Sequence, residues 1–392
     1  MEILISGASI AGPALAYWLG RYGYRPTIVE VAPALRSGGN AVDFRGPLHM
    51  GVLGKMGVLP ALRSVQTHGT AMRVVDAAGH QLMEWPAGLA GGDLEVQRGD
   101  LARILCEAGA DRTEYLFGDR IAAMTETPDG VEVRFASGLE RVFDLVIGAD
   151  GVHSGVRRLA FGPEERFVKH LGYYVGGWDV PDEWGLTRDS LLHNMPGKMM
   201  SVGGDHRDPA RAGAFIAFAS PRLEFDRRDR SQQVRLIRER YADMGWLAPR
   251  LLESLDSPGD LYFDQICRVD NPSWTRGRVA LVGDAACGAT IGGQGNGTAV
   301  VSAYVLAGEL FAAGGDHRVA FPAYERRIGK FARGTQKGGD TTGRFLAPRT
   351  ENGIRLRNYL NNKKWFIDLT FKIAADRSTN IELPDYAAST VR

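Results

Sequence analysis

The chain opens with apolar runs separated by a stretch of helical periodicity. Residues 2–6 form a short apolar run that ends at Gly7, as is typical of a parallel-sheet strand buried on both faces. Apolar residues then recur at helical spacing over 10–23, and 26–30 is a second apolar run that ends in Glu30. This order predicts a strand–helix–strand unit with parallel strands.

Later segments have different patterns. Residues 131–136 alternate apolar and polar side chains, which predicts a strand with one exposed face. Residues 168–220 are rich in aromatic and β-forming residues and predict an antiparallel sheet. Residues 231–256 have a helical pattern, and 353–376 have an amphipathic one.

Composition narrows the class of protein. Of the 392 residues, 44% are hydrophobic and 24% charged, which predicts a large buried core. Lys and Arg total 47 against 46 Asp and Glu, so we expect no nucleic-acid partner. No apolar stretch is long enough to predict a membrane span. The three cysteines, Cys106, Cys267 and Cys287, show no disulfide or metal-site spacing, and we expect no metal and a cytoplasmic location.

The first motif is the turn Gly7-Ala8-Ser9-Ile10-Ala11-Gly12 after the first strand. It resembles the dinucleotide fingerprint G-x-G-x-x-G, with Ser9 in place of the middle glycine. Such a turn brings the N-terminus of a helix, with its N–H groups and positive dipole end, to a pyrophosphate. The motif therefore predicts cofactor binding by Gly7, Ser9, Ile10, Ala11 and Gly12.

Glu30 strengthens the case for a dinucleotide. It ends the second strand, where a carboxylate accepts hydrogen bonds from an adenosine ribose. A carboxylate there repels a 2′-phosphate, so the spacing favours FAD or NAD over NADP as the bound dinucleotide.

The second motif follows a predicted buried strand over 279–282. Gly283-Asp284 ends this strand, and a glycine-rich loop leads into a helix over about 297–313. An acid at this place can bind ribityl hydroxyls, and the helix start can stabilise a reduced, anionic flavin. NAD has no ribityl chain, so the pair of motifs favours FAD. The predicted cofactor residues are Asp284, Gly293, Gly295, Asn296 and Gly297.

On these motifs the chain resembles the single-component FAD-dependent aromatic hydroxylases related to p-hydroxybenzoate hydroxylase. It is most similar to their antibiotic and polyketide hydroxylase branch, which includes tetracycline-inactivating monooxygenases. The segment 147–157 contains Asp150-Gly151, which resembles the family's Asp-Gly motif near FAD and NAD(P)H. The resemblance also implies that Arg36 lies near the adenosine, Arg45 near the flavin and Arg98 on the pyrophosphate.

Two positions depart from the family pattern. Cys287 replaces a histidine or tyrosine, and Thr290-Ile291 stands where the family has a proline before a slightly longer glycine-rich loop. Because that stretch lies against the flavin in the family, flavin motion and the substrate face are the features that these changes affect.

The resemblance and the patterns give one architecture. We expect an α/β fold in which a Rossmann-like FAD-binding domain is interleaved with a β-rich substrate domain and closed by a C-terminal helix. The expected FAD-binding domain covers 1–70, 95–167 and 268–345. The substrate-binding domain covers 71–94 and 168–267, and the C-terminal helix and tail cover 346–392.

The resemblance implies the activity. NADPH or NADH reduces the flavin as a transient co-substrate, molecular oxygen gives a flavin C4a-hydroperoxide, and an aromatic or polycyclic small molecule is hydroxylated. Arg45 is the one candidate catalytic residue, and we expect a monomer or homodimer. Aromatic and polar residues of the predicted antiparallel sheet are candidates for the substrate pocket, although each could equally be core: Tyr174, Trp178, His193, Met200 and Phe215.

Three other functions stay open. A flavin-dependent halogenase shares the N-terminal fold, but the sequence has no Trp-x-Trp-x-Ile-Pro segment. A flavin-dependent reductase or dehydrogenase would oxidise NAD(P)H without oxygenating a substrate. A flavoprotein that sequesters a ligand without catalysis would bind it and consume no NAD(P)H.

Overall fold

The computed structural model describes residues 1–35, 38–69, 71–86, 92–187, 189–205, 207–257, 259–292, 294–367 and 381–386. Two predicted cofactor residues, Arg36 and Gly293, lie outside these ranges.

The first strand lies in the middle of a mostly parallel sheet. β1 (Glu2–Ser6) pairs in parallel with β2 (Arg25–Glu30) on one side and with β11 (Leu145–Gly148) on the other. Strands covered on both faces need nearly continuous apolar sequence, which all three carry. The sheet order is β17 (Thr275–Arg276), β18 (Val279–Leu281), β11, β1, β2 and β7 (Glu114–Phe117), and only the β17–β18 pair is antiparallel.

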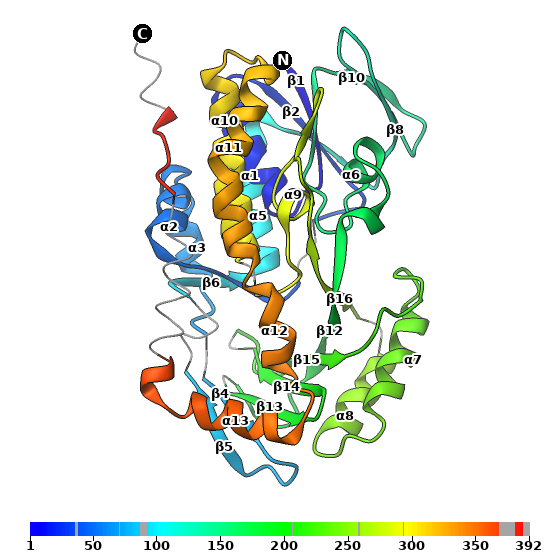
Figure 1. Ribbon diagram of the computed structural model, residues 1–392, viewed down its shortest axis with the longest axis vertical. Helices are drawn as coiled ribbons and strands as arrows, with labels where there is room; N and C mark the ends of the chain where they lie inside the picture. Colours follow the sequence, from blue (N-terminus) through cyan, green and yellow to red (C-terminus); the bar gives the residue numbers. More distant parts are fainter. Residues whose placement is uncertain are drawn as a thin grey trace.

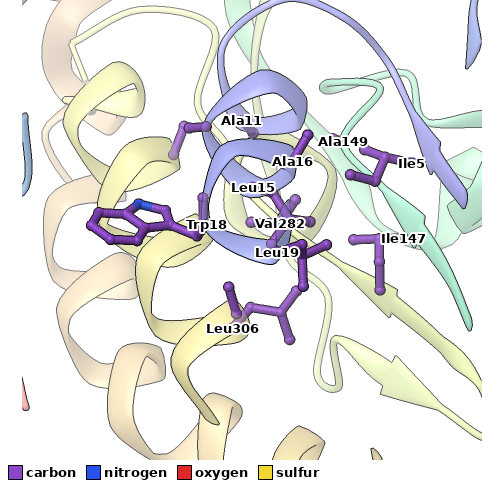
Figure 2. Packing of buried hydrophobic residues seen from close by; sticks show 14 of the residues in the cluster. Ile5, Ala11, Leu15, Ala16, Trp18, Leu19, Ile147, Ala149, Val282 and Leu306 are labelled. Carbon is purple, nitrogen blue, oxygen red and sulfur yellow. The ribbon is translucent and has the colours of Figure 1, made fainter. Parts of the chain in front are cut away.

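Helices pack beside this sheet (Figure 1). α1 (Ala11–Arg21) lies against α10 (Gly295–Ala312), which in turn packs on α11 (His317–Gln336). Trp18 meets Tyr304 edge to face with ring centroids 4.8 Å apart. Figure 2 shows Leu15 and Leu19 of α1 beside Val282 and Leu306. α10 is buried along most of its length, which explains its apolar sequence. No helix in the described ranges is long and apolar enough to cross a membrane.

A small antiparallel sheet confirms the alternating pattern over 131–136. β9 (Val131–Phe135) lies between β8 (Ile121–Glu126) and β10 (Glu140–Phe143). Val131, Val133 and Phe135 are buried, whereas Glu132 and Arg134 are exposed.

The predicted antiparallel sheet is present, and it also takes in an earlier hairpin. Seven strands form this sheet, in the order β16 (Leu261–Val269), β12 (Val168–Pro181), β15 (Arg211–Ala219), β14 (Lys198–Gly204), β13 (Ser190–Met195), β4 (Met72–Val75) and β5 (Gln81–Trp85). All neighbours are antiparallel except β13 and β4. The expectation of an α/β fold with a Rossmann-like part and a β-rich part is confirmed. The domain boundaries stay a prediction.

Helices lie on both sides of the seven-stranded sheet (Figure 1). α7 (Arg230–Tyr241) and α8 (Ala248–Glu253) pack on one face, and α12 (Gly339–Leu346) packs against β12, β15 and β16. The helical pattern predicted over 231–256 is confirmed except at a break between α7 and α8. The chain turns at Gly245-Trp246, where Trp246 has a φ of 56°, and a short 3-10 turn follows α8.

The predicted C-terminal helix begins as expected and is interrupted after Asn361, with residues 364–367 helical again. α13 (Glu351–Asn361) starts at Thr350, whose side chain accepts the Gly353 N–H. The part of the predicted helix from residue 368 onward lies outside the described residues.

A buried arginine holds α13 in place. The guanidinium of Arg357 donates to the carbonyls of Phe345 and Leu346 at the end of α12, at 2.9 and 3.1 Å, and to Asn194 Oδ1 of β13 at 2.7 Å. It also lies over the ring of Trp85. Burial lowers the pKa of Arg357 to about 10, so the group is charged at neutral pH. One cation thus satisfies helix-end carbonyls and joins three elements.

Arg357→Ala should lower the free energy of unfolding by about 3 kcal/mol, because the carbonyls and the Asn194 oxygen lose a charged donor. Thermal denaturation and hydrogen exchange along α13 would measure it. The control Arg355→Ala removes an exposed arginine of the same helix and should stay within about 0.5 kcal/mol of the parent chain. Equal stability of the two variants would contradict this role.

Candidate functional site

The turn after β1 is shaped by two glycines in backbone contact. Gly7 has a φ of 108°, and a Cβ there would lie 2.6 Å from the Ala149 carbonyl oxygen. A Cβ on Gly12 would lie 1.9 Å from the carbonyl oxygen of Gly7. Neither position therefore has room for a side chain. α1 begins at Ala11 after Ile10, and in the described structure no side chain caps its first turn. The helix start can therefore offer its N–H groups to a phosphate.

Arg98 reaches this turn from another element. It is the first residue of α5 (Arg98–Ala108) and follows β6 (Leu94–Gln97). Its guanidinium donates to Ser9 Oγ from Nη2 at 3.0 Å and from Nε at 3.2 Å. A cation thus stands beside the turn, where a pyrophosphate would need one.

Glu30 holds the other side of the turn. Its carboxylate accepts the N–H of Ala8 at 2.8 Å and the N–H of Ala32 at 2.9 Å. The carboxylate therefore lies at the end of β2 beside the turn that follows β1, as the sequence predicts for a ribose ligand. Its contact with a ribose stays a prediction.

Asp150 organises the loop after β11. It accepts the N–H of Gly155 at 2.8 Å and of Val156 at 3.1 Å, and the Ser154 hydroxyl also donates to it. Burial raises the pKa of Asp150, and these hydrogen bonds oppose the rise. Its carboxylate thus fixes the start of α6 (Gly155–Ala160).

Two basic residues tie that loop to other parts of the fold. Arg157 donates to the Ala285 carbonyl at 2.9 Å. His153 bridges Glu164 at 3.0 Å and Asp264 of β16 at 2.8 Å. Burial alone would lower the pKa of His153, but the two carboxylates raise it to about 9. His153 is therefore a charged link between the parallel sheet and the antiparallel sheet, a role that sequence patterns did not reveal.

The Gly-Asp motif lies next to the fingerprint turn. A Cβ on Gly283 would be 3.0 Å from Ala11 Cβ and 3.3 Å from Ala299 Cβ, so this glycine lets α1 and α10 approach. Asp284 begins α9 (Asp284–Cys287), and a Cβ on Gly295, the first residue of α10, would be 3.1 Å from its Oδ1.

The charge of Arg98 acts on this second motif as well as on the first. Burial raises the pKa of Asp284 to about 6, and the positive charge of Arg98 opposes the rise. The same arginine donates to Ser9. The two predicted motifs, far apart in sequence, therefore lie close together, with Gly283 packed against Ala11 and the charge of Arg98 acting on both. Asn296 and Gly297 complete the first turn of α10.

Arg45 lies at the edge of this region. It follows β3 (Ala41–Phe44), which pairs with β6, and it is the residue before α2 (Gly46–Lys55). Its side chain is about one-fifth exposed and forms an ion pair with Asp43. The N–H of the next residue, Gly46, donates to Asp93 at 2.6 Å.

Four of the five candidate substrate residues lie on the sheet face that α7 and α8 cover. Trp178 donates its indole N–H to Ser254 at 2.9 Å, and the Tyr174 hydroxyl accepts the Leu223 N–H at 2.8 Å. Met200 is fully buried in the same cluster. His193 contacts the Val75 carbonyl at 3.0 Å and the ring of Trp246. These side chains are core on that face.

Phe215 lies on the opposite face, in a cross-strand row that the sequence analysis missed. In register across the sheet are Tyr262, Gly177, Phe215 and Ser201. Gly177 lies between the two aromatic residues and carries no side chain, and Asn40 Oδ1 packs beside it, 3.3 Å from where a Cβ would stand. Tyr262 is 38% exposed and interacts electrostatically with Arg98 and Asp284. The sequence signal for this row is the alternation along β16, where Leu261 and Phe263 face α7 and α8 and Tyr262 therefore faces the other way.

Cys287 is buried at the end of α9. Burial raises the pKa of its thiol to about 12, so it is protonated at neutral pH and a poor nucleophile. Within the described ranges, no group of three or more His, Cys, Asp or Glu residues is arranged to hold a metal ion.

Comparison with known proteins agrees with this geometry. A family profile described as an FAD binding domain matches residues 1–187. A flavin-dependent monooxygenase of Legionella longbeachae is 35% identical over 99% of both chains. An uncharacterised protein of Mycobacterium tuberculosis is 42% identical over 85% of this chain and 91% of its own length.

Solved structures extend the likeness to three dimensions. The tetracycline destructase Tet(55) is 35% identical, with a TM-score of 0.85 over 98% of each chain. Klebsiella pneumoniae HpxO, solved with FAD and uric acid, has a TM-score of 0.73 over 96% of this chain and 97% of its own. At 21% identity, that second likeness shows the fold alone. The chain belongs to the family of FAD-dependent monooxygenases that includes the aromatic hydroxylases, and it is an enzyme that binds FAD.

Proposed function

We propose that this enzyme uses NADPH or NADH and molecular oxygen to hydroxylate an aromatic or polycyclic small molecule, with tetracycline-like antibiotics as the first class to test. The observation that carries the proposal is the meeting of the Ser9 turn, Arg98 and Asp284 at the start of α10. The likeness to Tet(55) over nearly the whole chain supports the substrate class.

The residues fit FAD. Gly7 and Gly12 let the turn pack closely so that the start of α1 can face a pyrophosphate, Arg98 supplies a cation, and Glu30 stands where an adenosine ribose would lie. Asp284 would accept ribityl hydroxyls, and the first turn of α10, with Gly295, Asn296 and Gly297, would face the flavin ring with its positive dipole end. That end stabilises negative charge on a reduced flavin.

The overall reaction consumes one molecule each of NAD(P)H, oxygen and substrate. NAD(P)H, oxygen, a proton and the substrate give NAD(P)⁺, water and the hydroxylated substrate. Bound FAD supplies the hydride acceptance and oxygen activation. The protein positions the substrate and excludes water. We propose that Arg45 acts on the flavin, because it lies at the junction of β3 and α2, next to the cofactor region.

The substrate would lie on the sheet face that carries Phe215 and Tyr262. Gly177 places no side chain between these aromatic residues, and the Asn40 amide that packs beside it is the polar group within reach. Flat apolar walls with few polar groups suit a fused-ring phenol. We propose this row in place of Tyr174, Trp178, His193 and Met200, whose polar atoms and surfaces are engaged with other core residues.

The activity is tested with purified protein. A flavin absorbance spectrum, NADPH oxidation that rises on addition of tetracyclines or other polycyclic phenols, and a product heavier by one oxygen atom are the expected results. Labelled oxygen gas should place the label in the product. NADPH oxidation that no panel member stimulates and that yields no oxygenated product would favour a reductase.

Glu30→Ala should weaken FAD binding by about tenfold or more, because the turn after β1 loses its acceptor for the Ala8 N–H. Titration of apoprotein with FAD would measure the dissociation constant. Glu107→Ala is the control, since Glu107 is exposed at the far end of α5 and pairs only with Arg103 among the described residues. Comparable affinities for the two variants would remove Glu30 from the cofactor site.

Gly177→Val should place a bulky side chain between Tyr262 and Phe215, displace the Asn40 amide and raise the KM for a polycyclic substrate by about tenfold. FAD affinity should change little. Gly213→Val is the matched control on the same face of the sheet, because a Cβ at Gly213 meets no atom of the described residues within 4 Å. A KM that is unchanged in Gly177→Val would place the substrate elsewhere.

A further inference from the structure

His49 fills the space that a side chain at position 297 would take. It lies in α2, is 1% exposed, and its ring contacts Phe44 and Phe331. A Cβ on Gly297 would be 2.1 Å from His49 Cε1, 2.3 Å from Nε2 and 2.4 Å from Nδ1. The imidazole thus packs directly on the backbone of the first turn of α10. As long as residue 49 is histidine in this position, residue 297 has room only for glycine.

The other contact of His49 is with Arg45. The Arg45 N–H donates to His49 Nδ1 at 3.2 Å, which makes Nδ1 the acceptor and leaves the ring proton on Nε2. Nε2 has no hydrogen-bond partner within the part of the chain that the structure describes. Burial lowers the pKa of His49 to about 4; Asp93 opposes this shift and Arg45 adds to it. At neutral pH the imidazole is therefore a neutral acceptor.

This hydrogen bond acts at the start of α2. Arg45 precedes the helix in an extended conformation, with φ −135° and ψ 138°. An acceptor four residues along the helix holds the N–H of Arg45, much as the second half of a capping box does. The Gly46 N–H is held separately by Asp93. The backbone of Arg45 is therefore fixed by a side chain that itself rests on α10.

We propose that His49 is a positioning residue that sets Arg45 relative to the first turn of α10. This inference rests on the proposed function, in which Arg45 and α10 both act on the flavin. It makes two separable claims. The size claim is that the His49 ring fills the space that a side chain at position 297 would need, and the positioning claim is that Nδ1 of His49 fixes the backbone of Arg45.

The size claim is tested by compensation. Gly297→Ala should weaken FAD binding by about tenfold or more, because a methyl group collides with the imidazole. The double variant His49→Ala/Gly297→Ala should bind FAD more tightly than Gly297→Ala alone, although it carries one more substitution. Titration of apoprotein with FAD measures both, and needs no substrate. A double variant as weak as Gly297→Ala, or weaker, overturns the size match.

The positioning claim is tested with two side chains of similar size. In His49→Asn, the Asn Oδ1 can take the place of Nδ1 and accept the Arg45 N–H, whereas His49→Leu has no acceptor. The rate of flavin reduction by NADPH, followed by loss of flavin absorbance, should stay within about threefold of the parent for Asn and fall about tenfold for Leu. Equal rates for the two variants overturn the claim.

A double-mutant cycle separates this role from a general loss of stability. If His49 acts through Arg45, His49→Leu should slow reduction in the parent and have no further effect in an Arg45→Ala background. Additive losses overturn the proposal. If the flavin of an Arg45→Ala variant is reduced as fast as that of the parent, Arg45 has no part in the mechanism and the positioning claim is overturned. The FAD titrations then test the size claim independently.

Discussion

The fold depends on close approach at three glycines. Gly12 brings α1 against the turn after β1, Gly7 brings that turn against the end of β11, and Gly283 brings α1 against α10. Gly7 and Gly12 meet backbone too closely for a Cβ, and Gly283 packs tightly on two alanine side chains, so helix starts and strand ends from distant parts of the sequence meet in one small volume. Charged groups can then act together there: Arg98 touches Ser9 and shifts the pKa of Asp284. A cofactor site built from backbone and a few charges requires this closeness.

The seven-stranded sheet divides its two faces between different tasks. On one face α7 and α8 bury Tyr174, Trp178 and Met200, and their packing provides a core. On the other, Gly177 interrupts a row of side chains between Tyr262 and Phe215. His153, charged because Glu164 and Asp264 flank it, joins this sheet to the loop after β11. The position of this sheet relative to the loop after β11 is thereby held by an ion pair as well as by packing.

The cofactor region could be predicted because its signals are local. A glycine turn after an apolar strand, or an acid at a strand end, carries its meaning within a few residues. The proposed substrate face was not predicted, because β12 is apolar on both faces and its own alternation gives no direction; only alternation along β16 distinguishes the two sides. Tyr174 and Tyr173 are both buried, and only the distant α7 and α8 decide which one faces the core beneath them. The break in the helical segment 231–256 was not predicted for a related reason, since the helical pattern is continuous through the backbone turn at Gly245-Trp246.

The first turn of α10 shows why such tertiary contacts concentrate at a functional place. Gly295, Asn296 and Gly297 are poor helix formers, and each glycine costs about 1 kcal/mol relative to alanine. The rest of α10 is apolar and buried, so the helix is stable in spite of its start. That start is therefore shaped by its neighbours, with Asp284 beside Gly295 and His49 beside Gly297. The geometry of this turn is thus set by the packing of α9 and α2 on it, and not by its own helix propensity.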